Sequence, residues 1–403
     1  MKVVSLTHRV PWPPDRGDRI TTSSFLTHLV SRGATVRAAC MAEDDRDEAA
    51  AAEFGRNVGE VCAPRIHPGM RKALSLRALL TGSSIGTTFC HHRKLAETVR
   101  RWLVEDPPDL IYAYSATMGL YALDHPGAVR VMQFAELDSD KWRQFADRGG
   151  LVSRQIYARE ARKMLEFERR VASAFDVSFV VSEVEKQLFM ERIPGVEPTV
   201  LPNGVDVTHF SSRGDTERDP NTIVFTGVMN YEPNVDGMTW FISECWPSIR
   251  DRHPDARMLI VGSSPTPRVL ELGRLPGVEV TGRVEETPPY FDRAAVAVAP
   301  LRLARGVQNK VLEAMSMGLP VVSSPQAAQG LGDVPAETMC VADGAAATID
   351  AVCRLIGDPA QARAMGGRAA TFVRERFRWQ LMFDRFDQVI DAATARHQAA
   401  RGR

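Results

Sequence analysis

Short apolar runs alternate with longer stretches of helical periodicity along almost the whole chain, and this alternation restricts the possible folds more than any other feature. Runs such as 2–7, 109–115 and 222–226 are too short for ordinary helices, and they have the continuous apolar character of fully buried strands. A chain that alternates in this way forms parallel sheets covered by helices on both faces. The sequence therefore predicts an α/β fold.

The pattern also gives approximate bounds for the expected elements. We expect strands at 2–7, 34–39, 58–62, 109–115, 129–133, 177–182, 222–226, 257–261, 278–281, 296–301 and 319–323. Helical patterns lie between these strands, for example at 20–31, 93–104, 153–173, 235–249 and 308–317, and the tail at 378–397 is also expected to be helical.

A polar segment without periodicity, near 201–220, divides the chain into two α/β halves. It starts with the turn residues Asn203 and Gly204, and a new buried strand follows it. A length of 403 residues fits two or three domains. We expect one domain at 1–205, a second at 206–378, and a C-terminal helix and tail at 379–403.

Composition excludes several classes of protein. Lys plus Arg and Asp plus Glu each number 50, so the net charge is zero, which argues against a nucleic-acid binder. The six cysteines are scattered and form no Cys/His cluster, so a zinc site is not expected, and free thiols fit a reducing compartment. With neither a long apolar segment nor a signal peptide, we expect a soluble cytoplasmic protein.

The segment 296–322 carries the strongest local signal, because it has the pattern strand, glycine loop, helix, glycine cap and strand. Gly306 precedes a helix start, where free N–H groups and the helix dipole favour a phosphate. Lys310 and Glu313 are three residues apart and hence on one helix face. A cation for a diphosphate and a carboxylate for sugar hydroxyls could therefore share one site. The alternative is an ordinary amphipathic helix with an exposed ion pair.

This segment resembles the donor-site region of the GT-B glycosyltransferases of family 4, also called group 1. In that family a Glu-x7-Glu motif precedes a Gly-x-Pro-Val-Val strand. Glu313 matches the second Glu, residues 318–322 match the strand, and Arg305 stands where the first Glu is expected. The form of residues 305–315 is similar to a narrower subgroup, the sugar transferases of exopolysaccharide and PEP-CTERM export systems. Further similar segments are 6–19, 138–142, 179–183, 203–206, 225–236 and 280–284.

The resemblance implies a GT-B architecture, in which two Rossmann-like parallel-sheet domains face each other across a cleft and a C-terminal helix crosses back to the first. It implies an N-terminal acceptor domain and a C-terminal donor domain. The implied reaction moves a sugar from a nucleoside diphosphate sugar to an acceptor hydroxyl, with retention at the anomeric carbon. No metal or other cofactor is expected.

Donor-side roles follow from the same resemblance. Lys310 would stabilise the departing diphosphate with help from Arg305 or Arg283, and Glu313 would hold the ribose hydroxyls. Many relatives carry an Arg and a Lys in the loop that here spans 227–234, which has neither. The expected donor-binding residues are Gly227, Gly262, Arg283, Gly306, Val307, Gln308, Asn309, Lys310 and Glu313, and the expected catalytic residues are Lys310, Glu313 and Arg305.

The acceptor side is expected in loops that follow strands of the first domain. The candidates are Arg16, Gly17 and Asp18 in a Pro-rich loop, and Asp138 and Lys141 further on. The alternatives are a rigid Pro-rich turn in the first case and a helix N-cap at Asp138 or Asp140 in the second.

Two other functions remain open: a nucleotide-sugar epimerase or hydrolase of the same fold, and a non-catalytic nucleotide-binding member of a polysaccharide assembly. The expected partners are a nucleoside diphosphate sugar and a glycan or lipid-linked glycan acceptor, with no nucleic acid. Basic residues between 71 and 101 would allow peripheral binding to an anionic membrane, at the inner face of the plasma membrane, or would form a solvated helix face.

Overall fold

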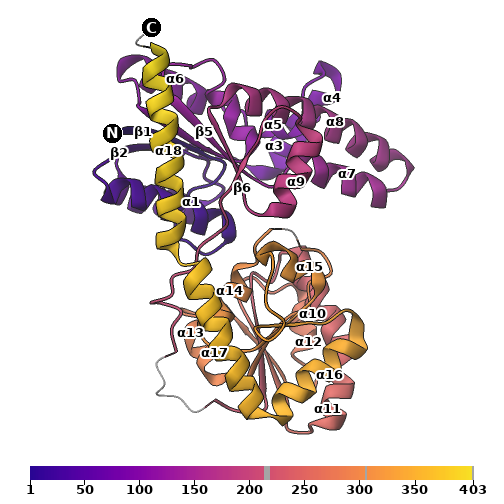
Figure 1. Cartoon of the computed structure of the whole chain (residues 1–403). Helices are drawn as coiled ribbons and strands as arrows, with labels where there is room; N and C mark the ends of the chain where they lie inside the picture. Colours follow the sequence, from indigo (N-terminus) through magenta and orange to yellow (C-terminus); the bar gives the residue numbers. More distant parts are fainter. Residues whose placement is uncertain (213–217, 305, 402–403) are drawn as a thin grey trace. The chain divides into compact units, whose positions relative to one another are not determined.

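The structure is a computed structural model that describes residues 1–212, 218–304 and 306–401, and it divides into two compact units (Figure 1). One unit comprises Met1–Leu201 together with Phe383–Arg403, and the other comprises Pro202–Met382. The second boundary lies inside the last helix, which therefore contributes residues to both units.

The first unit is built on a parallel sheet. In the described part of this unit the sheet has seven strands in the order β3-β2-β1-β4-β5-β6-β7. The strands are β1 Lys2–Thr7, β2 Thr35–Ala39, β3 Val61–Cys62, β4 Leu110–Tyr114, β5 Val129–Ala135, β6 Val177–Val180 and β7 Thr199–Val200. The helices are α1 Gly17–Ser31, α2 Asp45–Val58, α3 Pro68–Ser75, α4 Ala78–Thr81, α5 Ile85–Cys90, α6 Arg93–Glu105, the 3₁₀ helix η1 Ala116–Tyr121, α7 Asp138–Arg148, α8 Leu151–Ala174 and α9 Glu183–Arg192.

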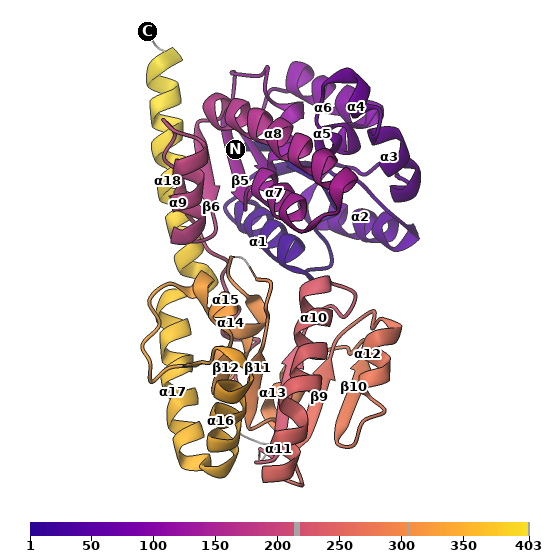
Figure 2. The ribbon, with the colours of Figure 1, turned by 90° about the vertical axis from the view of Figure 1, so that its right-hand side faces the viewer.

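The second unit repeats the plan with six described strands, again all parallel, in the order β10-β9-β8-β11-β12-β13. The strands are β8 Thr222–Thr226, β9 Arg257–Val261, β10 Val278–Gly282, β11 Val296–Ala299, β12 Val321–Ser323 and β13 Cys340–Val341. The helices are α10 Glu232–Trp240, the π-helical turn η2 Phe241–Cys245, α11 Trp246–Arg252, α12 Pro267–Leu272, α13 Pro288–Arg293, α14 Asn309–Ser316, α15 Pro325–Ala328, η3 Gln329–Leu331, α16 Gly344–Gly357 and α17 Pro359–Arg376. The last helix, α18 Trp379–Arg401, begins in this unit and continues into the first. Helix α14 packs against α17, and α11 packs against α16 (Figure 2).

The strand order reverses once in each sheet. In the first unit the reversal lies between the neighbouring strands β1 and β4, and in the second it lies between β8 and β11. Ligands of open parallel sheets bind outside the carboxyl ends of the strands at such a reversal. The topology therefore selects two places to examine, one in each unit.

The C-terminal part of α18 belongs to the core of the first unit. Phe386 is fully buried, with its ring centroid 4.8 Å from that of Phe25 in α1 and 5.8 Å from that of Phe179 in β6. Asp387, on the next position, accepts a 2.9 Å hydrogen bond from the ring of His28 and pairs with Arg32 at 2.7 Å. The expected return of the last helix to the first domain is thus confirmed (Figure 1).

The expected parallel sheets and α/β class are confirmed, and the differences concern short elements. The two-residue edge strands β7 and β13 were not expected, because two residues carry no period. The strand expected at 58–62 is reduced to Val61–Cys62, because α2 continues to Val58. The helix expected at 235–249 is interrupted by η2 before Pro247, where the proline removes a helical N–H donor.

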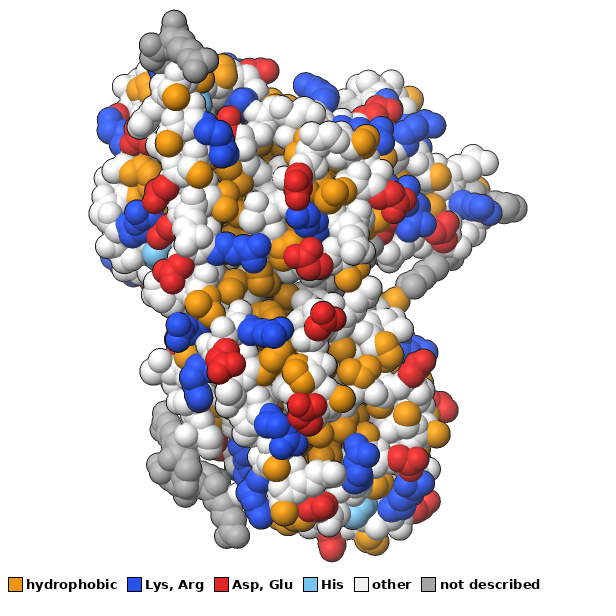
Figure 3. Space-filling view, in the orientation of Figure 1, with side chains coloured by type: hydrophobic (Ala, Val, Ile, Leu, Met, Phe, Trp, Pro, Cys, Tyr) orange, Lys and Arg blue, Asp and Glu red, His pale blue; other side chains and the backbone are white. Residues whose placement is uncertain are grey.

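No helix in the described ranges has the length and apolar character needed to cross a bilayer. Acidic and basic side chains are intermingled on the face drawn in Figure 3, as expected for a chain with zero net charge.

Replacing Phe386 with Ala should lower the free energy of unfolding of the first unit by about 3–5 kcal/mol, because a buried aromatic side chain is lost and a cavity remains. Arg385 is exposed on the same helix and provides the control, since Arg385→Ala should change stability by less than about 0.5 kcal/mol. Denaturant unfolding measures both variants. Equal midpoints would show that α18 does not contribute to this core.

Candidate functional site

Two loops of the second unit meet at the carboxyl ends of β8 and β9. Gly227 follows β8 and donates its N–H to the carbonyl oxygen of Val261 at 3.0 Å. Gly262 follows β9, and a Cβ atom added there would lie 1.7 Å from the carbonyl oxygen of Gly227. The two backbones are therefore in direct contact, and any side chain at Gly262 would separate them.

Lys310 reaches the same place from α14, the helix that follows β11. Its ammonium donates a 2.5 Å hydrogen bond to Oδ1 of Asn234 and lies 4.8 Å from the ring centroid of Phe225. A Cβ atom on Gly227 would stand 3.2 Å from this ammonium, so the glycine also leaves room for Lys310. Burial lowers the pKa of Lys310 to about 8, although the charge of Glu313 opposes the shift. The ammonium is therefore largely protonated at pH 7.

Glu313 lies one helical turn beyond Lys310 on α14, as the spacing predicts. Burial raises the pKa of its carboxyl group to about 7, and the charge of Lys310 opposes that increase. Both side chains are partly buried, and among the described residues they do not approach within the 4.0 Å of an ion pair. The arrangement differs from the exposed ion pair of the alternative interpretation, because each group keeps polar atoms available for a ligand.

Asn234 is a residue of this site that sequence reasoning missed. It lies in the first turn of α10 and is almost completely buried. Its Nδ2 donates to the carbonyl oxygen of Val228 at 2.9 Å, which leaves Oδ1 to receive the Lys310 ammonium. The available signal was a polar residue directly after a strand-glycine-loop segment and Pro233, but loop asparagines are common and the pattern alone does not single it out.

The loop before α14 is fitted closely to the segment after β12. A Cβ atom on Gly330 would lie 1.9 Å from the carbonyl oxygen of Gly306, so Gly330 was another missed contributor. Val307 is buried among core residues. Gln308 precedes the first turn of α14 without capping it through its side chain, and Asn309 accepts a 3.0 Å hydrogen bond from Asn203.

No described contact places either of the other two expected donor-side cations next to Lys310. Arg283 follows β10, the edge strand two positions from β8, and its side chain is exposed. Arg305 lies outside the described residues. Lys310 is therefore the expected donor-side cation whose position the structure defines best.

At the reversal in the first unit, Asp18 lies among charged and aromatic side chains. Its carboxylate accepts from Arg9 at 2.9 Å and lies 3.2 Å from Nε2 of His8, whose ring stacks near Tyr114. Burial alone would raise the pKa of Asp18, but hydrogen bonds and charges from His8 and Arg9 outweigh it and hold the pKa well below its usual range. Asp18 therefore holds the side chains of His8 and Arg9 at the start of α1.

Asp138 and Asp140 both lie in the first turn of α7, and the N-cap position belongs to Leu137, so the alternative in which Asp138 or Asp140 caps the helix is wrong. Glu168 of α8, a residue that sequence reasoning missed, accepts from the N–H of Ser139 at 3.1 Å instead. Burial and the charge of Asp138 raise the pKa of Glu168 to about 8. Oδ2 of Asp138 lies 3.5 Å from the hydroxyl of Ser115, a residue with a φ of +71° at the end of β4.

The remaining acceptor-side candidates are at the surface of the first unit. Arg16 is the extended residue before α1, Gly17 begins that helix in open space, and Lys141 is exposed on α7. None of these three residues has a described contact with Asp138.

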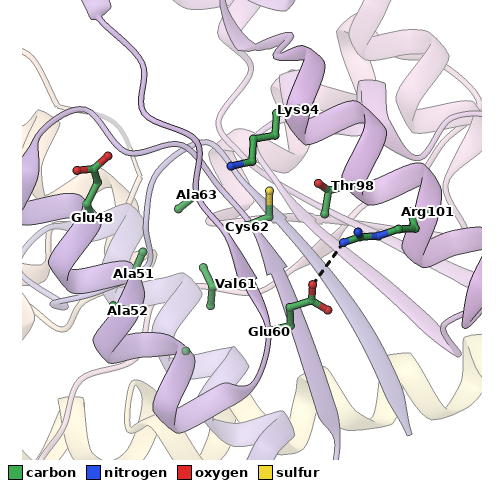
Figure 4. Close-up of a pocket in the computed structure, with 11 residues that line it drawn as sticks. Glu48, Ala51, Ala52, Glu60, Val61, Cys62, Ala63, Lys94, Thr98 and Arg101 are labelled. Carbon is green, nitrogen blue, oxygen red and sulfur yellow. Dashed lines mark ion pairs between the residues drawn. The ribbon is translucent and has the colours of Figure 1, made fainter.

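A separate pocket of about 590 Å³ lies in the first unit between α2, β3 and α6 (Figure 4). Its charged lining residues are Glu48, Glu60, Lys94 and Arg101, and Arg101 lies 3.6 Å from Glu60. None of the expected site residues lines it.

Two family models match the chain. Residues 17–204 match the glycosyl transferase 4-like domain, and residues 220–358 match the glycosyl transferases group 1. The two matches together cover most of both units.

Curated relatives are distant. A GDP-mannose-dependent alpha-(1-6)-phosphatidylinositol monomannoside mannosyltransferase of Mycolicibacterium smegmatis is 26% identical over 258 residues, which are 57% of this chain and 66% of that protein. An uncharacterized 44.6 kDa protein in the cps region of Klebsiella pneumoniae is 21% identical over 193 residues, which are 45% of this chain and 50% of that protein. The chain thus spans about half to two thirds of the length of these relatives.

Solved structures match over nearly the whole chain. Sucrose-phosphate synthase from Thermosynechococcus elongatus has a TM-score of 0.73 at 17% identity, covering 98% of this chain and 100% of that chain. HepE of Anabaena in complex with UDP-glucose has a TM-score of 0.66 at 12% identity, covering 97% and 100%. At these identities the likeness establishes the fold, which is GT-B.

Replacing Gly262 with Ala should destabilise the second unit by about 1–3 kcal/mol or more, because the new methyl group would force the β8 and β9 loops apart. Gly367, on α17, has open space around its Cβ position and is the control, since Gly367→Ala should stabilise the helix by roughly 0.5–1 kcal/mol. Thermal unfolding of both variants measures the difference. An unchanged melting temperature for Gly262→Ala would contradict the close backbone contact.

Proposed function

We propose that this chain, which belongs to the group 1 glycosyltransferase family, transfers a glycosyl group from a nucleoside diphosphate sugar to an acceptor hydroxyl. The observation that carries the proposal is the pair Lys310 and Glu313, partly buried at the start of α14 where the second sheet reverses its order. A cation suited to a diphosphate and a carboxylate suited to ribose hydroxyls stand one helical turn apart there.

The chemistry requires stabilisation of a leaving group that gains negative charge. Lys310 would neutralise the departing diphosphate, together with the N–H groups in the first turn of α14, in a setting where water screens charge only partly. Arg283 and Arg305 are further candidates for the same role. Glu313 would hold the ribose of the donor. The acceptor proton would pass to the leaving phosphate, so that no dedicated protein base and no metal is required.

We assign the acceptor to the first unit, with Arg16, Gly17, Asp18, Asp138 and Lys141 as the candidate contacts. Resemblance at residues 6–19 and 305–315 supports retention at the anomeric carbon and a role in exopolysaccharide or other cell-surface glycan synthesis at the cytoplasmic face of the membrane. The acceptor would then be a glycan or a lipid-linked glycan.

A panel of nucleotides and nucleotide sugars, read by thermal shift and then by turnover, tests this function. A ligand at 100 times its Kd should stabilise the protein by about 2.7 kcal/mol. Transfer of sugar to an added acceptor supports the proposal. Release of free sugar or isomerisation of the donor without an acceptor would identify a hydrolase or epimerase, and binding without turnover would identify a non-catalytic member.

Lys310→Ala should lower kcat by about 10²–10³-fold, by analogy with the loss of one oxyanion donor, because the lost charge acts on a group whose negative charge grows during the reaction. Glu313→Ala should act mainly on donor affinity, since ribose contacts are similar in the ground and transition states. Steady-state kinetics separate the two effects. Arg363→Ala, an exposed change on α17, is the control and should retain wild-type turnover.

The pH profile of kcat/KM should be bell-shaped, with an acid limb near pH 7 and an alkaline limb near pH 8. Glu313 must lose its proton to accept ribose hydroxyls, and Lys310 must keep its proton to bind the diphosphate. Because the two groups interact, both limbs belong to the pair. Lys310→Arg should remove the alkaline limb, since guanidinium stays charged. A profile that is flat from about pH 6 to 9 would contradict these roles.

A further inference from the structure

The segment formed by α3 and α4 exposes an unusual number of large apolar side chains. Between residues 67 and 83 almost every position is exposed, and Leu80 keeps 91% of its surface accessible. We call this region the α3–α4 surface and define it by its exposed apolar residues Met70, Leu74, Leu76, Leu79 and Leu80. Few exposed apolar residues elsewhere in the described ranges lie so close together in the chain. Exposed apolar side chains gathered in one segment are typical of an interaction site.

Buried residues and hydrogen bonds attach the α3–α4 surface to the rest of the first unit. Ser75 and Ala78 are buried beneath it. Arg159 of α8 donates to the carbonyl oxygen of Ala78 at 2.7 Å. The buried carboxylate of Glu160 accepts from the N–H groups of Ile85 and Gly86 at 2.8 and 2.9 Å. Figure 1 shows α3, α4, α5 and α8 grouped in the first unit.

The charges around these apolar residues have one sign. Residues 61–96 contain no Asp or Glu. Lys72 and Arg77 are exposed beside the apolar residues, and neither has an ion-pair partner among the described residues. Two other cations of the expected basic face are engaged within the unit: Arg71 donates to the carbonyl oxygens of Phe89 and His91, and Arg93 pairs with Glu97 at 2.7 Å.

We propose that the α3–α4 surface docks on a lipid bilayer that contains anionic lipids. Its leucines and Met70 would enter the boundary between headgroups and acyl chains, while Lys72 and Arg77 would meet the anionic headgroups. This narrows the basic face expected from sequence to the α3–α4 surface and adds apolar insertion as the main source of affinity. With Lys72 and Arg77 as the cations beside the inserted residues, each contributing about fivefold near an anionic surface, high salt should weaken binding but leave a substantial part of it.

The charge pattern favours lipid over a second copy of the chain. A two-fold contact would place the same surface of each copy against the other. Lys72 and Arg77 would then face identical cations, with no acidic residue in 61–96 to pair with them. An anionic membrane complements the same groups.

Flotation or sedimentation of the full chain with phosphatidylcholine vesicles, with and without phosphatidylglycerol, tests the proposal at low and high salt. The wild type should bind the anionic vesicles most strongly and retain measurable binding at high salt. Leu76→Glu combined with Leu80→Glu should reduce binding by about tenfold or more, because inserted leucines are replaced by charges. Lys72→Glu combined with Arg77→Glu should remove the preference for phosphatidylglycerol.

Leu270→Glu combined with Leu275→Glu is the matched control, because these leucines are 52% and 44% exposed in the second unit. It should bind vesicles as the wild type does. The proposal is overturned if the wild type binds neither vesicle, if the control loses as much binding as the α3–α4 variant, or if that variant instead dissociates a dimer seen by sedimentation. The assay measures lipid binding and not turnover, so its outcome is independent of the proposed glycosyl transfer.

Discussion

Parallel strand pairing is the constraint on which the rest of this structure depends. Parallel neighbours cannot be joined by hairpins, so each strand returns to the same edge of the sheet through a crossover. Where the strand order reverses, the loops that follow the two neighbouring strands lead to helices on opposite faces of the sheet. A space for a ligand therefore opens between these two loops. This brings together groups that are distant in sequence. In the first unit, Asp18 and Tyr114 both lie next to His8. In the second unit, Asn234 and Lys310 form a hydrogen bond although they are 76 residues apart.

Burial acts in opposite senses on the two charged groups of the second unit. It raises the pKa of Glu313 to about 7, so between about pH 4.5 and 7 the folded chain holds more protons than the unfolded chain, and the contribution of Glu313 to stability falls as pH rises. It lowers the pKa of Lys310 to about 8, so the contribution of Lys310 increases above that pH. The pair therefore stabilises the fold least between pH 7 and 8. A diphosphate that binds there would restore favourable interactions to the ammonium.

Local pattern predicted much of this structure. The two parallel sheets and the placement of Lys310 and Glu313 on one turn of α14 follow from periodicity or spacing, whereas the domain plan and the return of α18 to the first unit follow from the resemblance. The edge strands β7 and β13 were missed because two residues carry no period. Asn234, Gly330 and Glu168 were missed for another reason: each acts through a tertiary contact with a residue distant in sequence, and nothing in its own neighbourhood reveals that contact.

The surroundings of Lys310 bear on its proposed role, because the loop at 227–234 has neither Arg nor Lys and Lys310 would act as the main cation. A carboxylate at position 234 would hold the ammonium but also cancel its charge. The amide of Asn234 fixes the ammonium through a 2.5 Å hydrogen bond and leaves the charge in place. The face of the Phe225 ring, 4.8 Å away, favours the charged form further. Glu313 stands a turn beyond, outside ion-pair distance. The uncharged side chains of Asn234 and Phe225 therefore orient the cation, and its charge remains available to an anionic ligand.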